Sequence, residues 1–227
     1  MNIAWGITGA GHFLRESYEI FWTLAQEHQI TTFVSGAGEE VLRMYGLFDK
    51  MSEISNGEYL REIFLESRSG KSFPKAGRFL LGKYDALIIS PATSNTVAKV
   101  VHGISDSLIT NAVTQTVKGG TPVYIVPVDI SGTLMSEMPY FIDRDACEKC
   151  DDCPPKERCP KNAITDQIDL LKCDGCGLCV DCCPHSAIRG GFVKCRVRDI
   201  DAQNVETMRS MDGIAVLKNP NEILSLF

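Results

Sequence analysis

The distribution of cysteine is the feature that most constrains this chain of 227 residues. All ten cysteines lie between Cys147 and Cys195, and none precedes them. A secreted scaffold held by disulfides spreads its cysteines through a short chain. Because a long cysteine-free region comes first here, we expect a domain that folds without cysteine, joined to a local metal-binding module.

Two runs of regularly spaced cysteines make up this module. The first is Cys147-x2-Cys150-x2-Cys153-x5-Cys159-Pro160, and the second is Cys173-x2-Cys176-x2-Cys179-x3-Cys183-Pro184. The second run has the spacing of bacterial ferredoxins, in which three closely spaced thiolates bind one 4Fe–4S cluster and the fourth binds the other cluster. The predicted ligands of the first cluster are therefore Cys147, Cys150, Cys153 and Cys183. Those of the second cluster are Cys173, Cys176, Cys179 and Cys159.

Zinc is the alternative metal for such a segment. Structural zinc sites use four ligands, commonly in two pairs, and two tandem triplets that each precede a Cys-Pro do not fit that arrangement. The repeated sequences CPKNAIT (159–165) and CPHSAIR (183–189) also indicate an internally duplicated ferredoxin fold. Cys182 and Cys195 fall outside both ligand sets, and we interpret them as small buried hydrophobic residues.

The first 140 residues alternate between strand and helix signals. Predicted strands are residues 2–8, 30–35, 86–92 and 122–128, and predicted helices are residues 12–28, 39–47, 94–101 and 106–118. This alternation predicts an α/β fold, a flavodoxin-like (Rossmann-like) parallel sheet with helices on both faces. The cysteine segment adds a small α+β ferredoxin domain with two 4Fe–4S clusters.

Small and hydroxyl residues follow three of these strands, at positions 8–11, 35–38 and 90–96. The carboxyl ends of parallel strands are where such sheets bind ligands, because helix N-termini supply free N–H groups there. Each stretch alone is a weak signal, since small residues also form turns. Together they predict a nucleotide-like cofactor.

The stretch SPATSNTVAKVVHGISDSLITNAV (90–113) resembles the PASANT motif of the homo-oligomeric flavin-containing decarboxylases and the related flavin prenyltransferases. The segment GITGAG (6–11) and the turn at Ser35 are similar to the same family, so the resemblance covers roughly residues 1–140. It implies FMN near a subunit boundary and trimers assembled into shells of 12 or 24 subunits. The FMN-binding residues that it implies are Gly9, Ala10, Ser35, Ser90, Thr93, Ser94, Asn95 and Thr96.

Two departures argue against decarboxylation and prenyl transfer. The decarboxylases carry an active-site histidine in the middle of the domain, but here no histidine lies between His28 and His102. In addition, the segment PVDISGTLMSEMP (127–139) replaces the substrate-binding methionine segment of the decarboxylases. Joined to a two-cluster ferredoxin, the chain resembles archaeal flavoproteins related to dihydromethanopterin reductase (acceptor). This resemblance implies reduction of 7,8-dihydromethanopterin, or a related dihydropterin, to the tetrahydro form, with a soluble ferredoxin as a possible electron donor. The alternative is an electron-transfer flavoprotein that relays electrons from ferredoxin to a partner enzyme.

We expect the ferredoxin domain to be an insertion. A helix-like segment (201–211), the apolar run GIAVL (213–217) and a helix start at Asn219-Pro220 follow the last cysteine. The expected domains are residues 1–143, which bind FMN, residues 144–196, which bind the clusters, and residues 197–227, which rejoin the first domain.

Few side chains suggest acid–base chemistry, and no catalytic residue is assigned. His12 is a weak candidate, and Lys71, Lys75 and Arg78 are candidates for contacts with an anionic substrate tail or the FMN phosphate. Asp129, after the strand 122–128, is a further weak candidate. The net charge of −6 argues against nucleic acid as a partner. No apolar run reaches the length of a transmembrane helix and the N-terminus lacks a signal peptide, so we expect no membrane association and a cytoplasmic location.

Overall fold

The computed structural model describes residues 1–227. Its larger part is a six-stranded parallel sheet in the order β3-β2-β1-β4-β5-β8, which confirms the predicted α/β fold class. The strands are β1 (Asn2–Ile7), β2 (Gln29–Val34), β3 (Ile63–Leu65), β4 (Ala86–Ala92), β5 (Val123–Pro127) and β8 (Ile214–Val216). Every residue of β4 is buried, as expected for a parallel strand covered on both faces.

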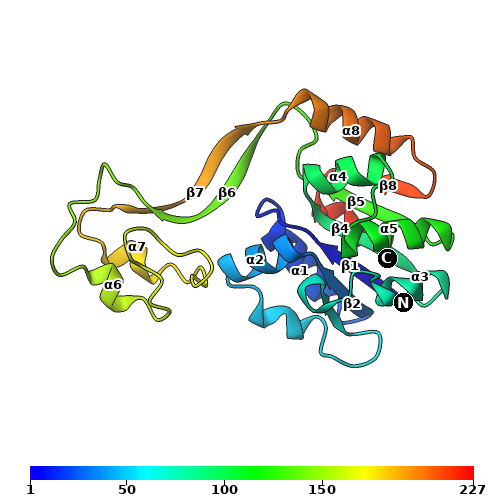
Figure 1. The fold of residues 1–227 in the computed structure, drawn as a ribbon, viewed down its shortest axis with the longest axis horizontal. Helices are drawn as coiled ribbons and strands as arrows, with labels where there is room; N and C mark the ends of the chain where they lie inside the picture. The colour runs from blue at the N-terminus through cyan, green and yellow to red at the C-terminus, as the bar shows by residue number, and fades with distance from the viewer.

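Helices cover both faces of this sheet (Figure 1). Successive side chains of a strand point to opposite faces, so Trp5 of β1 packs into one hydrophobic cluster and Ala4 into the other. The cluster around Trp5 is covered by α1 (Leu14–Leu24), α2 (Gly36–Met44) and the 3-10 helix η4 (Pro220–Leu226). The cluster around Ala4 is covered by α3 (Gly77–Leu80), α4 (Ser94–Val101), α5 (Leu108–Lys118) and α8 (Asp199–Arg209).

The observed elements differ from the expected ones mainly at their ends. The helix expected over residues 12–28 begins only at Leu14, because Phe13 adopts a left-handed conformation with φ of 66°. The last helix is a 3-10 helix. Further short 3-10 helices lie outside the sheet: η1 (Asp49–Glu53), η2 (Glu66–Arg68) and η3 (Pro74–Ala76).

A long antiparallel ribbon, which the sequence analysis did not anticipate, leaves the sheet after β5. It consists of β6 (Thr133–Ile142) and β7 (Ile188–Arg196), and it carries residues 143–187 at its far end (Figure 1). The pairing is irregular between Met138 and Phe141, where Pro139 has no N–H to donate. The ribbon thus holds the cysteine segment away from the main body of the sheet.

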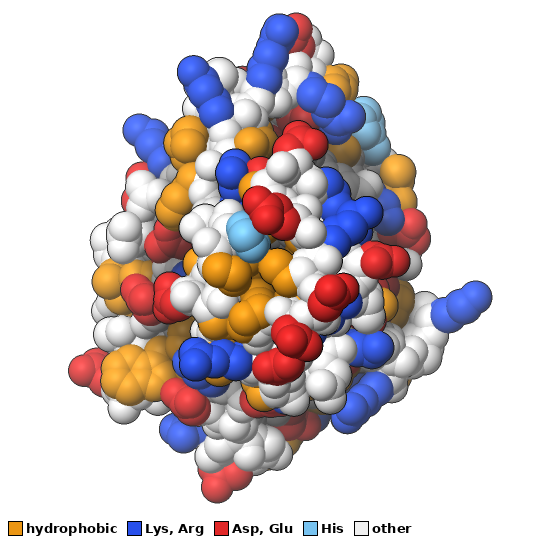
Figure 2. Space-filling model, turned by 90° about the vertical axis from the view of Figure 1, so that its left-hand side faces the viewer, with side chains coloured by type: hydrophobic (Ala, Val, Ile, Leu, Met, Phe, Trp, Pro, Cys, Tyr) orange, Lys and Arg blue, Asp and Glu red, His pale blue; other side chains and the backbone are white.

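The cysteine segment has its own small core, formed by Ile142, Ile164, Ile168, Cys179 and Ile188. Its helices are α6 (Pro154–Arg158) and α7 (Leu178–Cys182). Figure 2 looks onto this end of the molecule and shows a hydrophobic patch with acidic side chains at its margin.

The chain then returns to the sheet. Helix α8 packs against α4, and β8 adds to the open edge of β5 through pairs such as Val123 with Ile214. This connectivity supports the division that we propose, with residues 144–196 inserted between residues 1–143 and residues 197–227. No helix of the structure has both the length and the apolar character needed to cross a bilayer.

Candidate functional site

The strand order places a topological switch between β1 and β4. From β1 the chain builds outward to β2 and β3, and from β4 it builds in the opposite direction to β5. Connections lead away on both sides of this point, and the general rule for such sheets places the ligand site, here called the crevice, between the loops after β1 and β4 at the carboxyl ends of the strands. Two of the three predicted cofactor-binding stretches, at 8–11 and 90–96, meet there.

Thr8 joins these two loops. Its buried hydroxyl donates a hydrogen bond to the carbonyl oxygen of Pro91 at 2.8 Å and accepts one from the backbone N–H of Thr93 at 2.9 Å. Thr8 belongs to the predicted stretch 8–11, but it was not among the FMN-binding residues implied by the family resemblance, and a structural role for its hydroxyl was not expected. Thr8 therefore fixes the spacing of the crevice walls.

The third predicted stretch lies against the first. A Cβ atom on Gly9 would lie 2.6 Å from the Cβ of Ala37, and one on Gly38 would lie 2.7 Å from the carbonyl oxygen of Ile7. Glycine is thus required for the first turn of α2 to approach the end of β1. The hydroxyl of Ser35 caps this helix by accepting a hydrogen bond from the N–H of Gly38 at 3.0 Å.

The first turn of α4 forms the opposite wall. Thr93 caps the helix by accepting a hydrogen bond from the N–H of Thr96 at 3.2 Å. The hydroxyl of Ser94 donates to the carboxylate of Asp129, which follows β5, and the Asn95 side chain is exposed. The carboxylate of Asp129 therefore lies beside a helix N-terminus, where the helix dipole stabilises negative charge.

Two of the predicted cofactor-binding residues are buried, and their hydroxyls bond to other hydroxyls of the protein. The Ser90 side chain is fully buried and its hydroxyl bonds to that of Ser17 at 2.7 Å, while the Ser90 carbonyl accepts from the indole of Trp5 at 2.7 Å. The Thr96 hydroxyl bonds to that of Thr93 at 3.0 Å. The structure brings Gly9, Ala10, Ser35, Thr93, Ser94 and Asn95 to the crevice region and uses Ser90 and Thr96 to support it.

His12 follows the first loop and is half-buried. Burial lowers the pKa of its imidazole, whereas the carboxylates of Glu16 and Asp129 partly counter that effect. The ring also stacks on Phe13, with 4.0 Å between ring centroids. His12 is therefore held near Asp129 and is mainly neutral at pH 7.

Two of the three basic candidates in the segment 71–78 have other partners, and the third, Lys71, is exposed. Arg78 forms an ion pair with Glu62, and the ammonium of Lys75 lies 5.3 Å from the centroid of the Phe64 ring. Lys75 also lines an open cavity of about 360 Å³ beside β3, together with Phe48, Phe64 and Arg68.

The cysteines of the inserted segment gather around two separate cavities. One cavity, of about 190 Å³, is lined by Cys147, Cys150, Cys153 and Cys183, together with proline residues and His185. These four thiols are the set assigned to the first cluster. They come from both cysteine runs, so the fold brings distant parts of the segment together.

The second cavity is lined by Cys159, Cys173, Cys176 and Cys179, which are the set assigned to the second cluster. Its volume is only about 10 Å³, close to the space that one water molecule occupies. The loop from 173 to 179 would have to widen to admit a cluster.

The duplicated sequence is matched by duplicated hydrogen bonds to sulfur. The N–H of Ala163 donates to the Sγ of Cys159 at 3.3 Å, and the N–H of Ala187 donates to the Sγ of Cys183 at 3.4 Å. In each repeat the donor lies four residues after the cysteine. Hydrogen bonds of this kind to cluster ligands tune the reduction potential.

Burial also affects the thiols of the second set. It raises the pKa of Cys173 and Cys176, and it raises the pKa of Cys179 to about 11. These thiols are protonated at neutral pH, so a metal that binds them must displace protons.

The two remaining cysteines line neither of these cavities, and both are only partly buried, so the expectation that they are buried was wrong. The thiol of Cys182 donates to the carbonyl oxygen of Cys179 at 3.5 Å, and Cys195 lies on β7 opposite Leu134. No group of three or more His, Cys, Asp or Glu side chains is arranged to hold a single metal ion.

Comparisons with known proteins find two families in the chain. Residues 1–143 match a family model described as Flavoprotein, and residues 166–189 match one described as 4Fe-4S binding domain. A dihydromethanopterin reductase (acceptor) of Methanosarcina mazei is 58% identical over 235 residues, covering 100% of this chain and 98% of that protein. Another, of Methanocaldococcus jannaschii, is 49% identical over 237 residues, covering 100% and 96%.

A crystal structure of Burkholderia xenovorans DmrB in complex with FMN, described as a cubic protein cage for redox transfer, has the same fold. Its TM-score is 0.65 at 23% identity, over 99% of this chain and 91% of that one. Fold and cysteine sites together define the class of protein, a flavoprotein domain that carries a 4Fe–4S binding segment. Within that class the chain belongs to the dihydromethanopterin reductase (acceptor) family, which confirms the resemblance noted from its sequence.

Proposed function

We propose that the chain reduces 7,8-dihydromethanopterin, or a closely related dihydropterin, to the tetrahydro form, using electrons that pass through two 4Fe–4S clusters to FMN. The observation that carries this proposal is the sorting of eight cysteines into two sets of four around two cavities, in one chain with a flavoprotein fold. The full-length similarity to two dihydromethanopterin reductases supports the choice of substrate.

The chemistry of the thiols fits two clusters. Each set contains three cysteines from one run and the Cys-Pro cysteine of the other, which is the exchange found in two-cluster ferredoxins. The N–H groups of Ala163 and Ala187 already point at sulfur. The first cavity is wide, whereas the loop around the second must open by moving Cys176, the most exposed of its ligands.

The crevice at the switch point fits FMN. The amides of the loop 8–11 and the first turns of α2 and α4 offer N–H donors to a phosphate, and Gly9 leaves room for a close approach. When bound, FMN supplies the conversion of one-electron input into a two-electron reduction. Gly9, Ala10, Ser35, Thr93, Ser94 and Asn95 would contact it, while Ser90 and Thr96 would hold the strand end behind it.

The overall reaction adds two electrons and two protons across a C=N bond of the dihydropterin. A soluble ferredoxin, or another one-electron donor protein, is oxidised by one electron in each of two transfers. His12 follows the loop after β1, and burial lowers the pKa of its imidazole, which favours the neutral ring. In this role it would accept a hydrogen bond from the substrate or relay a proton from solvent.

A single-turnover experiment tests the proposal. The anaerobically reduced protein is mixed with 7,8-dihydromethanopterin, and flavin absorbance and pterin products are followed together. Reoxidation of the flavin with formation of tetrahydromethanopterin is the expected result. If the pterin leaves the flavin reduced while a partner enzyme reoxidises it, the chain is an electron-transfer flavoprotein instead.

We also propose that the protein assembles from trimers into a shell of 12 or 24 subunits. The fold shared with the cage-forming DmrB supports this. Exposed hydrophobic side chains, among them Trp22 on α1 and Leu81 after α3, are available for contacts between copies. Native mass spectrometry of the holoprotein measures the number of subunits, and a monomeric species would contradict the proposal.

A further inference from the structure

The inserted segment touches the flavoprotein domain at one tight junction, the C-terminal end of α2. A Cβ atom on Gly46 would lie 2.2 Å from the carbonyl oxygen of Asp174, and one on Gly175 would lie 2.7 Å from the carbonyl oxygen of Met44. Both glycines have positive φ, 67° and 69°. Such mutual close approach requires glycine on both sides, so the two backbones are in direct contact.

This contact involves the loop of the second cysteine set. Asp174 and Gly175 lie between Cys173 and Cys176, two of the four thiols that line the second cavity. The residues that line the first cavity, in contrast, include neither Asp174 nor Gly175. In Figure 1 the yellow loop that precedes α7 reaches toward α2, whereas α6 lies on the far side of the segment.

Tyr45, at the centre of this junction, also touches the crevice. Only 6% of its surface is exposed, and a Cβ atom on Gly11 would lie 2.2 Å from its hydroxyl oxygen. The hydroxyl donates to the carbonyl oxygen of Glu137 on β6 at 2.8 Å. One side chain thereby contacts the loop after β1 and the ribbon, and its backbone contacts the loop of the second cysteine set.

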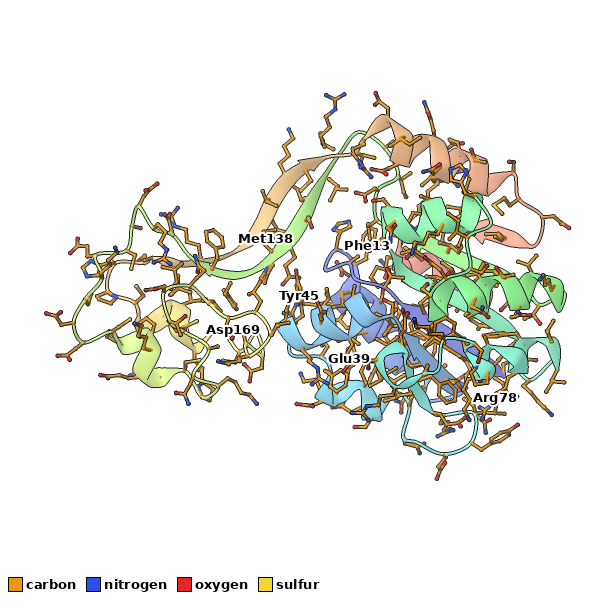
Figure 3. All side chains as sticks on the ribbon, in the orientation of Figure 1. Phe13, Glu39, Tyr45, Arg78, Met138 and Asp169 are labelled. Carbon is orange, nitrogen blue, oxygen red and sulfur yellow. The ribbon has the colours of Figure 1, made fainter.

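Arg15 strengthens this arrangement from the other side. Its guanidinium lies 5.5 Å from the centroid of the Tyr45 ring and 3.1 Å from the carboxylate of Glu137. Figure 3 shows Tyr45 on the side of the flavoprotein domain that faces the inserted segment and the ribbon near Met138. The junction is therefore braced by α1, α2 and β6 together.

We propose that the second cluster site, and not the first, exchanges electrons with the flavin of the same protomer, and that residues 44–46 are the positioning bridge between them. The proposal rests on the proposed function. It orders the residues along the route: Cys147, Cys150, Cys153 and Cys183 would hold the group that accepts electrons from a one-electron donor protein, and Cys159, Cys173, Cys176 and Cys179 would hold the group that passes them across the junction to a bound flavin. Two such transfers, with protons from solvent, complete a two-electron reduction, and the donor loses one electron in each.

A pair of glycine substitutions tests the bridge. Gly46→Ala introduces a Cβ against Asp174, whereas Gly120→Ala introduces one at φ of 72° with no atom within 4 Å. Both variants place a Cβ atom on a backbone of similar left-handed conformation, so this source of strain is matched. Only Gly46→Ala pushes the two domains apart.

Two readouts are measured without any pterin, so that failure of the substrate assignment cannot affect them. Amide hydrogen exchange over residues 173–179 reports whether the junction opens, and stopped-flow absorbance reports how fast the flavin bleaches after the clusters. We expect faster exchange and several-fold slower flavin reduction in Gly46→Ala than in Gly120→Ala, with equal iron content. Faster exchange with an unchanged flavin rate would overturn the proposal, because electrons would then reach the flavin by another path.

A milder pair keeps the test decisive if Gly46→Ala does not fold. Tyr45→Phe removes the hydrogen bond to Glu137 at the junction, and Tyr18→Phe removes a comparable bond to Glu53, 3.0 Å long, away from it. We expect only Tyr45→Phe to increase exchange over residues 173–179 and to slow flavin reduction. Equal behaviour of the two variants in both readouts would contradict the bridge.

Discussion

Arg78 donates two hydrogen bonds to Glu62, from Nη1 to Oε2 at 2.5 Å and from Nη2 to Oε1 at 3.0 Å. This bidentate pair ties α3 to the segment before β3, and both side chains are mostly buried, with 17% and 21% exposed. This ion pair gives Arg78, a basic residue of a glycine- and proline-bearing segment, a structural role. A planar guanidinium makes such paired bonds, whereas a lysine ammonium does not.

We therefore expect Arg78→Lys to lower the free energy of unfolding by about 1–3 kcal/mol, because a buried charge-assisted hydrogen bond is lost. The guanidinium lowers the pKa of Glu62 below its ordinary value of 4.5. A carboxyl with a depressed folded-state pKa stabilises the protein above its unfolded pKa and loses that effect as the pH falls through the folded value. The difference between wild type and Arg78→Lys should thus shrink at acidic pH.

Anaerobic urea denaturation followed by circular dichroism measures this difference. Arg209→Lys is the control, because the pair of Arg209 with Glu206 is on the surface, with 71% of the glutamate exposed. Exposed ion pairs contribute little. An equal loss of stability in both variants would show that the Arg78 pair has no special role.

Thr8→Val should weaken FMN binding and stability together. Valine keeps the shape of threonine but leaves the N–H of Thr93 without its partner, at a cost of about 1–3 kcal/mol. Thr8→Ser keeps the hydroxyl and should bind FMN nearly as well as wild type. Fluorescence titration of the apoprotein with FMN compares them. Equal affinities of the valine and serine variants would mean that Thr8 does not set the crevice geometry.

The sequence was informative where burial dominates. The run ALIISPA indicated a strand buried on both faces, and β4 spans those residues; the helix expected over 94–101 was also found. The ribbon was missed, because only Ile142 and Ile188 of its residues are buried and Pro139 interrupts β6. The stability of β6 comes from pairing with a strand that is distant in the sequence, as in the pair of Thr133 with Arg196, and no local pattern encodes such a pairing.

The sites follow the same rule. Cysteine spacing alone grouped the thiols as the cavities group them, because the ligand exchange between runs is a property of the spacing. The inward roles of Ser90 and Thr96 depend on partners in α1 and α4 and were not visible in a strand-end motif. Likewise, nothing near Gly46 in the sequence points to Asp174.

His12→Asn should remove part of the pH dependence of stability. Burial lowers the pKa of His12 from 6.5, so folding opposes its protonation. The contribution of the neutral ring is complete above the unfolded pKa and is lost as the pH falls through the lower, folded value. Wild type should therefore lose stability relative to His12→Asn as the pH falls from about 7 to about 5.

Thermal unfolding of both proteins across this range checks the expectation. His28→Asn is the control, since His28 lies outside the crevice, near the last residue Phe227. Parallel curves for wild type and His12→Asn would show that the imidazole does not resist protonation in the folded protein.

Double substitutions of cysteine test which thiols share a cluster. Cys150→Ser should remove about four of eight irons per chain, and adding Cys183→Ser should remove no further iron, because both thiols line the first cavity. Adding Cys159→Ser instead should remove the rest, because Cys159 lines the second cavity. Non-additivity within a site and additivity between sites is the signature of shared function.

Iron and acid-labile sulfide analysis with visible absorbance gives the readout, and Cys182→Ser is the control because its thiol lines neither cavity. If Cys150→Ser with Cys183→Ser lost all iron, Cys183 would belong with the second run and the exchange of ligands would be wrong. Zinc in place of iron in the wild-type protein would contradict the proposal that these cysteines bind 4Fe–4S clusters. Each double variant differs from Cys150→Ser by the loss of one further sulfur atom, so comparison of their iron contents decides which cluster Cys183 and Cys159 bind.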